Sequence, residues 1–427
     1  MYIYNNISNI LITLYAISDV YSLLSYARIK TFISTNLLNP HLTILSGDFI
    51  SPIKYTNLDD GLSVMEVLDS VPIDLVSFGN HEFDIEPKKL NNSLIKNKKS
   101  TFISTNIANI ANTYDYYIYS DNITGITIGF IGLCTNDFYQ KYPIKFKSVK
   151  LVNLTINHIQ QKYKPNFIIG LTHAELDLDI KYTKLFPQIN LILGGHIHSH
   201  NCYNGVSIPI LRTGENADSI YEIVILSDFK FEINLIDISN LQPDLDIVKI
   251  YQQKEKMFEQ YNKEILFYFN STFTNINPRK NQESLPQLIC SLVTNYFSSK
   301  LTILNSGMFK LRGKTFHGNF TIGNFKELVY YNDYIVEICI DINDLVNGFN
   351  YSNTNYYDDG GYLQTDNLDI IYNQYKYNSS KCVRLSISTL VLDGINKNPF
   401  FFKYKLKNKY DGIPIHNIIS TYKGQYF

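Results

Sequence analysis

The stretch Phe78-Gly79-Asn80-His81-Glu82-Phe83-Asp84 decides how this chain is interpreted. It follows Ile73–Ser77, a short apolar run of the composition that buried strands have. Polar side chains at the end of such a strand lie where the ligand crevice of an α/β sheet forms. The glycine permits backbone shapes that other residues resist, so Asn80, His81 and Asp84 can converge there. Taken alone, the stretch is equally well explained as a polar loop in which His81 is hydrogen-bonded and inert.

Other strand-like runs also end in side chains that can bind a metal ion. The predicted strands are residues 10–18, 42–45, 73–77, 101–106, 126–133, 167–171 and 191–193. Five of them are followed by candidate ligands, which are Asp19, Asp48, Asn80, His173 and the pair His196 and His198. One such histidine is more often structural, but the joint occurrence is much less expected by chance. Carboxylate, amide and imidazole ligands suit Mn, Zn, Fe or a similar divalent ion, whereas the cysteine positions exclude a thiolate site.

Stretches with helical spacing of apolar residues lie between these strands. They predict helices at residues 22–32, 61–69, 152–162 and 177–185. The alternation of strands and helices predicts a layered α/β domain over residues 1–245. Residues 246–270 are charged and helix-prone and predict a linker helix, and residues 271–427 predict a second α/β domain.

Length and charge restrict the class of protein. A chain of 427 residues can form two or three domains, and its formal net charge of -1 indicates neither nucleic acid nor an anionic membrane surface as a partner. No apolar run is long enough to span a bilayer. The segment Asn9–Ile17 lacks the basic flank and cleavage site of a signal peptide, which slightly favours an intracellular location. The sequence leaves the compartment and the oligomeric state open.

The five cysteines show neither metal-type nor disulfide-type spacing. We therefore expect all of them to be buried thiols: Cys134, Cys202, Cys290, Cys339 and Cys382.

Several blocks together resemble a known family. Gly47-Asp48, the stretch at 78–84, Thr172-His173 and Gly194-Gly195-His196-Ile197-His198 look like the signature blocks of the dinuclear calcineurin-like metallophosphatases, and more narrowly of the 5'-nucleotidase and UDP-sugar hydrolase branch. Leu304-Asn305-Ser306-Gly307 and Gly360-Gly361-Tyr362-Leu363-Gln364 resemble the C-terminal blocks of that branch. The resemblance covers most of the chain. It implies a four-layer αββα metallophosphatase sandwich followed by a second α/β nucleotidase domain.

The resemblance also implies a centre with two divalent ions, such as Zn or Mn. Asp48 would bridge the two ions. The other ligands would be Asp19 and His198 at the first position, and Asn80, His173 and His196 at the second. A water ionised between the ions would attack phosphorus in line.

Further residues would contact the substrate according to the same resemblance. His81 would stabilise charge on the phosphoryl group, and Asp84 would orient its imidazole. In the second domain, Asn305 and Gly307 would help to hold the nucleoside. Tyr331 lies where the family has a base-stacking phenylalanine, although an aromatic residue in such a tyrosine-rich chain is more often core.

Three departures from the family pattern affect this interpretation. The first motif is usually Asp-x-His, and here it is Asp19-Val20-Tyr21. A neutral phenol is a poorer ligand than imidazole, and we favour a packing role for Tyr21. Lys310 falls where the family has a substrate-clamping arginine, and lysine lacks the planar fork of arginine. The Gly-Gly-Asp-Gly segment of the family is not found before Phe427, so we expect the second domain to be short at its C-terminus.

We therefore expect a dinuclear metal-dependent phosphatase that releases phosphate from a nucleoside 5'-monophosphate, its small-molecule partner. A cyclic-nucleotide phosphodiesterase or a nucleotide-sugar hydrolase would use the same centre. An alternative from another class is a degenerate homologue that binds a nucleotide without turnover. Tyr21, Lys310 and the short C-terminus favour this alternative, whereas the joint retention of the other site residues argues against it.

Overall fold

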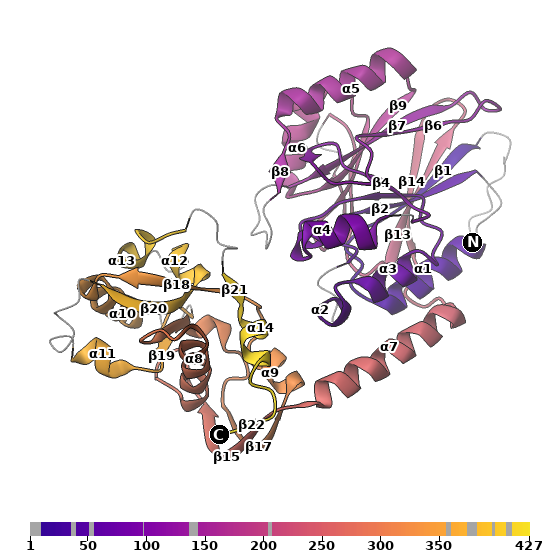
Figure 1. Cartoon of the computed structure of the whole chain (residues 1–427). Coiled ribbons are helices and arrows are strands. Elements are labelled where there is room, and N and C mark those ends of the chain that lie inside the picture. The colour runs from indigo at the N-terminus through magenta and orange to yellow at the C-terminus, as the bar shows by residue number, and fades with distance from the viewer. Residues whose placement is uncertain are drawn as a thin grey trace. The chain divides into compact units, whose positions relative to one another are not determined.

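The structure is a computed structural model that describes residues 10–35, 40–50, 55–96, 98–135, 144–203, 207–355, 360–373, 382–394, 398–406 and 412–427. The chain divides into two compact units, Met1–Lys256 and Met257–Phe427, and each is described here by itself. The division falls within helix α7 (Leu245–Lys263), which overlaps the stretch predicted as a linker (Figure 1).

Two six-stranded sheets form the centre of the first unit. The first contains, in spatial order, β14 (Phe231–Asp237), β13 (Ser219–Leu226), β1 (Ile10–Ile17), β2 (His41–Ser46), β3 (Leu75–Ser77) and β4 (Thr101–Ile103). The second contains β11 (His200–Tyr203), β12 (Ile210–Thr213), β10 (Leu191–Gly195), β9 (Phe167–His173), β7 (Thr127–Cys134) and β6 (Tyr117–Ser120). The short strands β5 (Ile107–Ala108) and β8 (Lys145–Phe146) pair with each other.

The inner faces of the two sheets share one core. Leu14 and Ile44 of the first sheet belong to the same cluster of buried side chains as Ile169 and Leu193 of the second. The neighbours β1 to β4 are parallel, as are β7, β9, β10 and β12. Strands of such sheets are covered on both faces, which explains why their sequences are apolar throughout.

Helices cover the two outer faces. Helices α1 (Leu23–Thr35) and α3 (Leu62–Leu68) lie on one side, and α5 (Val149–Tyr163) and α6 (Leu176–Leu185) lie on the other (Figure 1). The ring of Phe32 on α1 packs against Tyr15 of β1, and Ile156 on α5 packs with Ile131 of β7. The shorter helices of this unit are α2 (Thr56–Asp59) and α4 (Pro87–Lys89). The predicted αββα sandwich is confirmed.

The second unit is also α/β. One sheet has the order β17 (Lys314–Thr321), β15 (Ile265–Asn275) and β22 (Gln425–Tyr426). The other has the order β19 (Leu363–Thr365), β16 (Thr302–Asn305), β20 (Val383–Ser388), β18 (Tyr334–Ile340) and β21 (Ile413–Pro414). The helices are α8 (Ser284–Phe297), α9 (Ile322–Leu328), α10 (Ile342–Asn355), α11 (Leu368–Tyr372), α12 (Thr389–Leu392), α13 (Pro399–Phe402) and α14 (Ile415–Ser420).

The structure corrects the prediction for three cysteines. Cys339 on β18 and Cys382 form a disulfide, with Cα atoms 5.5 Å apart, and Cys202 is exposed. Cys134 and Cys290 are buried thiols, as expected. The sequence separation of 43 residues gives no sign of the bond, because antiparallel pairing of β18 with β20 is what brings the two residues together. Among the described residues, no helix is long and apolar enough to cross a membrane.

Candidate metal centre

The candidate ligands lie at or just after the carboxyl ends of β1, β2, β3, β9 and β10. Three of them, Asp19, Asp48 and His196, have positive φ angles of 53°, 53° and 80°. This left-handed conformation costs a non-glycine residue about 1–3 kcal/mol and persists only where the surrounding structure imposes it. Such strain collects at functional sites, so the backbone at these strand ends points to a site.

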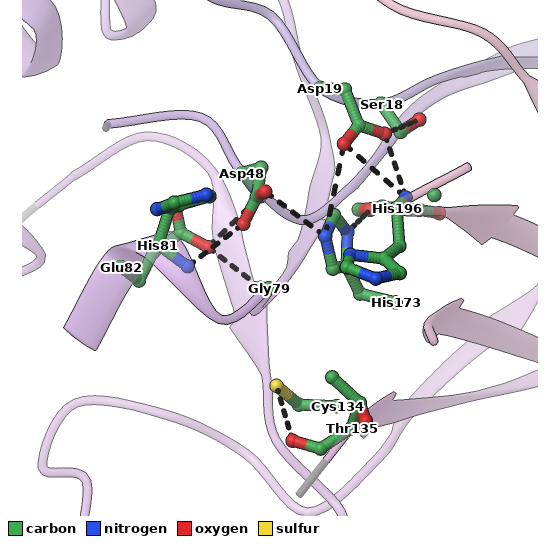
Figure 2. Close-up of polar contacts among 12 residues, drawn as sticks. Ser18, Asp19, Asp48, Gly79, His81, Glu82, Cys134, Thr135, His173 and His196 are labelled. Carbon is green, nitrogen blue, oxygen red and sulfur yellow. Dashed lines mark hydrogen bonds and ion pairs between the residues drawn. The ribbon is translucent and has the colours of Figure 1, made fainter. Parts of the chain in front are cut away.

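Asp19, Asp48 and His173 form a buried cluster with the spacing of metal ligands. The Nε2 atom of His173 lies 3.1 Å from Asp48 Oδ2 and 3.8 Å from Asp19 Oδ1, and each side chain is at most 1% exposed. The Nδ1 atom is 2.8 Å from the carbonyl oxygen of Ser46, which turns Nε2 toward the carboxylates (Figure 2). Within the part of the chain that the structure describes, Nε2 has no aligned hydrogen-bond partner.

The charges of this cluster favour a bound cation. Burial alone would lower the pKa of His173, but Asp48 and Asp19 outweigh it and raise the pKa to about 10. Burial would raise the pKa of Asp48, but the neighbouring His173 outweighs it and lowers the pKa. The two carboxylates therefore attract positive charge, which a proton on His173 or a divalent ion can supply, since metal binding displaces protons from its ligands.

Asn80 and His196 lie beside this cluster. Asn80 is only 7% exposed, and its Oδ1 has no hydrogen-bond partner among the described residues. A buried amide oxygen without a donor costs free energy, which a cation would relieve. The ring of His196 lies 5.3 Å from that of His173, centre to centre. Its backbone N–H donates to Asp19 Oδ2 at 3.0 Å. The donors present thus fit a divalent ion of the Mn or Zn type.

Tyr21 contacts the centre, whereas the sequence favours a packing role. Its hydroxyl lies 3.0 Å from Asp19 Oδ1 and 3.0 Å from Asp48 Oδ2. The same hydroxyl lies 3.2 Å from Nε2 of His198. The side chain of His198 is 46% exposed, and its Nδ1 lies 3.2 Å from Oε2 of Glu215. The signal for this role was the Asp-x-Tyr spacing itself, which a chain with 34 tyrosines obscures.

Glu82 connects the two loops that carry Asp48 and Asn80. Its side chain is fully buried. Oε2 accepts the backbone N–H groups of Asp48 at 3.0 Å and Gly79 at 2.7 Å, and Oε1 accepts those of Phe49 at 2.8 Å and Ile50 at 3.2 Å. Sequence reasoning gave Glu82 no role. The four bonds explain why a carboxylate stands there, since it can accept several hydrogen bonds at once.

His81 and Asp84 form a pair at the edge of the centre. Nδ1 of His81 lies 2.8 Å from Asp84 Oδ2, and the two side chains are 36% and 35% exposed. The backbone N–H of His81 donates to Asp48 Oδ1 at 3.0 Å (Figure 2). Burial acts to lower the pKa of His81, but the hydrogen bond to Asp84 and the charge of Asp48 outweigh it and raise the pKa to about 9. The two carboxylates therefore favour the protonated form of His81.

Arg212 on β12 is hydrogen-bonded to the backbone beside His173 and His196. It forms an ion pair with Asp179 of α6, with Nη2 and Oδ2 2.6 Å apart and both side chains 0% exposed. Its Nη1 donates to the carbonyl oxygen of Ala174 at 2.7 Å and to that of Gly195. Sequence reasoning missed this residue, although an arginine inside an apolar strand was an available signal.

The second unit holds its own group of predicted site residues. Asn305 is the last residue of β16, and its Oδ1 is buried without a hydrogen-bond partner in the described chain. A Cβ atom at Gly307 would lie 3.1 Å from Asn305 Nδ2 and 3.2 Å from the backbone of Gly360, so a larger residue would require these neighbours to shift. Lys310 Nζ lies 5.2 Å from the centre of the Tyr331 ring, which is 57% exposed.

The cations near Lys310 make this region electropositive. Burial lowers the pKa of Lys310, and the positive charges of Arg279 and Arg312 lower it further. A region that combines several cations with an exposed aromatic ring suits an anionic, aromatic ligand.

Comparisons with known proteins agree with this geometry. Residues 12–200 match the family model of the calcineurin-like phosphoesterases. The trifunctional nucleotide phosphoesterase protein YfkN of Bacillus subtilis is 25% identical over 210 residues, which cover 38% of this chain and 14% of that protein. The structure of a 5'-nucleotidase precursor from Thermus thermophilus aligns with 96% coverage of both chains, 15% identity and a TM-score of 0.59.

A candidate 5'-nucleotidase from Staphylococcus aureus, solved in complex with alpha-ketoglutarate, aligns over 97% of this chain and 96% of its own. Its TM-score is 0.67 and its identity is 11%. The resemblance inferred from the sequence motifs is confirmed, and at these identities the solved structures show that the fold extends over both units.

Proposed function

We propose that this chain, whose residues 12–200 belong to the calcineurin-like phosphoesterases, is a metal-dependent phosphoester hydrolase that releases phosphate from nucleoside 5'-monophosphates. One observation supports the metal dependence above all. Two carboxylates and His173 are buried together, with His173 Nε2 3.1 Å from Asp48 Oδ2, while the buried Asn80 Oδ1 has no hydrogen-bond partner in the described chain. Such an arrangement is costly in free energy unless a cation joins it.

The ligands are proposed from the family pattern together with this geometry. Asp48 would be shared between two positions. The remaining ligands would be Asp19 and His198 at the first position, and Asn80, His173 and His196 at the second. A bound divalent ion would supply a water ionised near neutral pH and would neutralise charge on the phosphoryl oxygens.

The residues of the chain itself contribute orientation and charge. His81 carries a proton at neutral pH and can donate a hydrogen bond to a phosphoryl oxygen as negative charge develops there. Asp84 holds Nδ1 of that ring, so that the other nitrogen is the donor. Glu82 fixes the loops of Asp48 and Asn80 through backbone N–H groups, which keeps the ligands in place before substrate binds.

The substrate class rests on the second unit. Asn305 and Gly307 offer a close-fitting polar surface for a nucleoside, Tyr331 offers an exposed ring for stacking, and Lys310 offers a positive charge for phosphate. The 5'-nucleotidases of Thermus thermophilus and Staphylococcus aureus share this two-unit fold. Cyclic-nucleotide phosphodiester and nucleotide-sugar hydrolysis remain alternatives, because they would use the same centre.

The test is phosphate release by protein loaded separately with Mn, Zn, Co or Mg, from AMP, a cyclic nucleotide and a UDP-sugar. We expect AMP to be the preferred ester and Asp48→Ala to be inactive. Removing one donor to developing charge costs about 10²–10³ in kcat, so we expect a loss of this size for His81→Asn. The exposed Asp228→Asn is the control and should be unchanged. Binding of AMP without turnover of any ester would identify a non-catalytic nucleotide-binding protein instead.

A further inference from the structure

We propose that the hydroxyl of Tyr21 takes the place of the first metal ion, so that this chain binds one divalent ion tightly, at the position of Asn80, His173 and His196. This inference deepens the proposed function and rests on it only for the existence of a metal centre. It concerns the feature in which the chain departs from its family, the sequence Asp19-Val20-Tyr21.

The position of the hydroxyl carries the argument. It lies 3.0 Å from Asp19 Oδ1, 3.0 Å from Asp48 Oδ2 and 3.2 Å from His198 Nε2. These three atoms belong to the residues proposed as ligands of the first position. Ligands at about 2.0–2.2 Å from one ion lie about 3 Å from each other, so an ion could enter here only by taking the hydroxyl as an additional ligand or by displacing it. A neutral phenol is a poorer ligand than imidazole, so both routes weaken binding of an ion at this position.

Tyr21 is held in this position at three points. Its backbone N–H donates to Oδ1 of Asn216 at 3.0 Å. Its ring packs edge-on against the ring of His198, with centres 5.5 Å apart. Its hydroxyl lies within hydrogen-bond distance of both carboxylates, to one of which it can donate its single proton. Displacing the side chain would break contacts at the hydroxyl and the ring together.

At the second position Asn80 Oδ1 is buried and has no hydrogen-bond partner among the described residues. His173 Nε2 lies 3.1 Å from Asp48 Oδ2, and His196 Nε2 lies 3.3 Å from Oε1 of the exposed Glu175. An ion entering this position gives Asn80 Oδ1 a contact and replaces the pairing of His173 with Asp48, both of which are themselves proposed ligands. The two positions are therefore unequal, and the second one binds first.

Metal stoichiometry tests the proposal independently of activity. Metal-free protein is titrated with Mn²⁺ or Zn²⁺ in a calorimeter, and the metal content after dialysis is measured by mass spectrometry. We expect one ion per chain in the wild type, with any second ion bound about 10- to 100-fold more weakly, the range by which single contacts around a site change metal affinity. Tyr21→His should bind two ions. Tyr21→Phe removes only the hydroxyl and should strengthen binding of the second ion.

The matched control is Tyr116→Phe, which removes a hydroxyl that contacts Tyr163 outside this centre and should leave one ion per chain. Circular dichroism confirms that each variant is folded. Two ions of equal affinity in the wild type, or one ion in both Tyr21 variants, would overturn the proposal. So would a tyrosinate-to-iron absorption band on loading with Fe³⁺, which would make Tyr21 a ligand. Hydrolysis of AMP by a wild type with two ions would refute this inference alone, whereas one ion without any turnover would refute only the proposed function.

Discussion

Replacing Glu82 with glutamine tests whether the centre is built around this one carboxylate. The side chain accepts four backbone N–H groups, two on each oxygen. Glutamine has nearly the same shape but presents an NH₂ group in place of one oxygen. Whichever way the amide turns, two N–H groups then face a donor instead of an acceptor. The loop that carries Asp48 or its link to Gly79 must therefore shift.

Two opposing contributions set the magnitude for stability. Two hydrogen bonds to a charged acceptor, at about 1.5–3 kcal/mol each, give a loss of about 3–6 kcal/mol. Burial, with the charge of Asp48, raises the pKa of Glu82 from its ordinary 4.5 to about 7. The ionised carboxylate is therefore disfavoured by its surroundings, and the neutral amide avoids part of that cost. We expect a net destabilisation below the about 3–6 kcal/mol of the two hydrogen bonds, together with a loss of metal affinity of about 10- to 100-fold.

Hydrogen exchange is the direct assay, because it reports on the individual amides. In Glu82→Gln, at least two of the amides at Gly79, Asp48, Phe49 and Ile50 should exchange faster than in the wild type. The control is Glu86→Gln in the same loop, where the side chain is exposed. Calorimetric titration of both variants with Mn²⁺ then separates metal affinity from stability. If the exchange rates of the four amides and the metal affinity of Glu82→Gln match those of the control, the carboxylate does not hold the two loops in place.

Two further predictions concern structure away from the ligands. Arg212→Met leaves the buried Asp179 without its partner and should destabilise the first unit by about 3–5 kcal/mol in urea denaturation. The control Arg28→Met, at a partly exposed arginine, should cost under about 1 kcal/mol. Adding Asp179→Leu to Arg212→Met should recover most of the lost stability, and no recovery would contradict an explanation by the unpaired charge. A thiol reagent should detect three free cysteines in the unfolded, unreduced protein, and five reactive thiols would refute the disulfide. The double variant Cys339→Ser and Cys382→Ser should be less stable by about 4 kcal/mol, the entropic cost of closing the loop that the disulfide spans.

The sequence predicts those features that depend on neighbouring residues. The strands that precede Asp19, Asp48 and His173 are continuous apolar runs, and each was placed within two residues of its observed ends. Patterns of this kind are local, so a single sequence displays them. The fold class followed from the alternation of strands and helices together with the motif resemblance.

What the sequence did not predict depends on contacts between distant residues. Arg212 lies 33 positions after Asp179 in the sequence, so the sequence does not show that the two residues form an ion pair. The pair forms only because β12 and α6 pack together. The disulfide of Cys339 and Cys382 arises from strand pairing.

The backbone structure of the centre and the number of metal ions that it binds are separable properties. Asp19, Asp48 and His196 have left-handed backbones, and hydrogen bonds to buried carboxylates hold the loops of Asp48 and His196. Ion binding to so rigid a frame requires little rearrangement, so its free energy depends on the atoms already present at each position. At one position the buried Asn80 Oδ1 lacks a partner among the described residues, and at the other the hydroxyl of Tyr21 lies 3.0 Å from both carboxylates. A single side chain can therefore change the metal content while the fold stays the same.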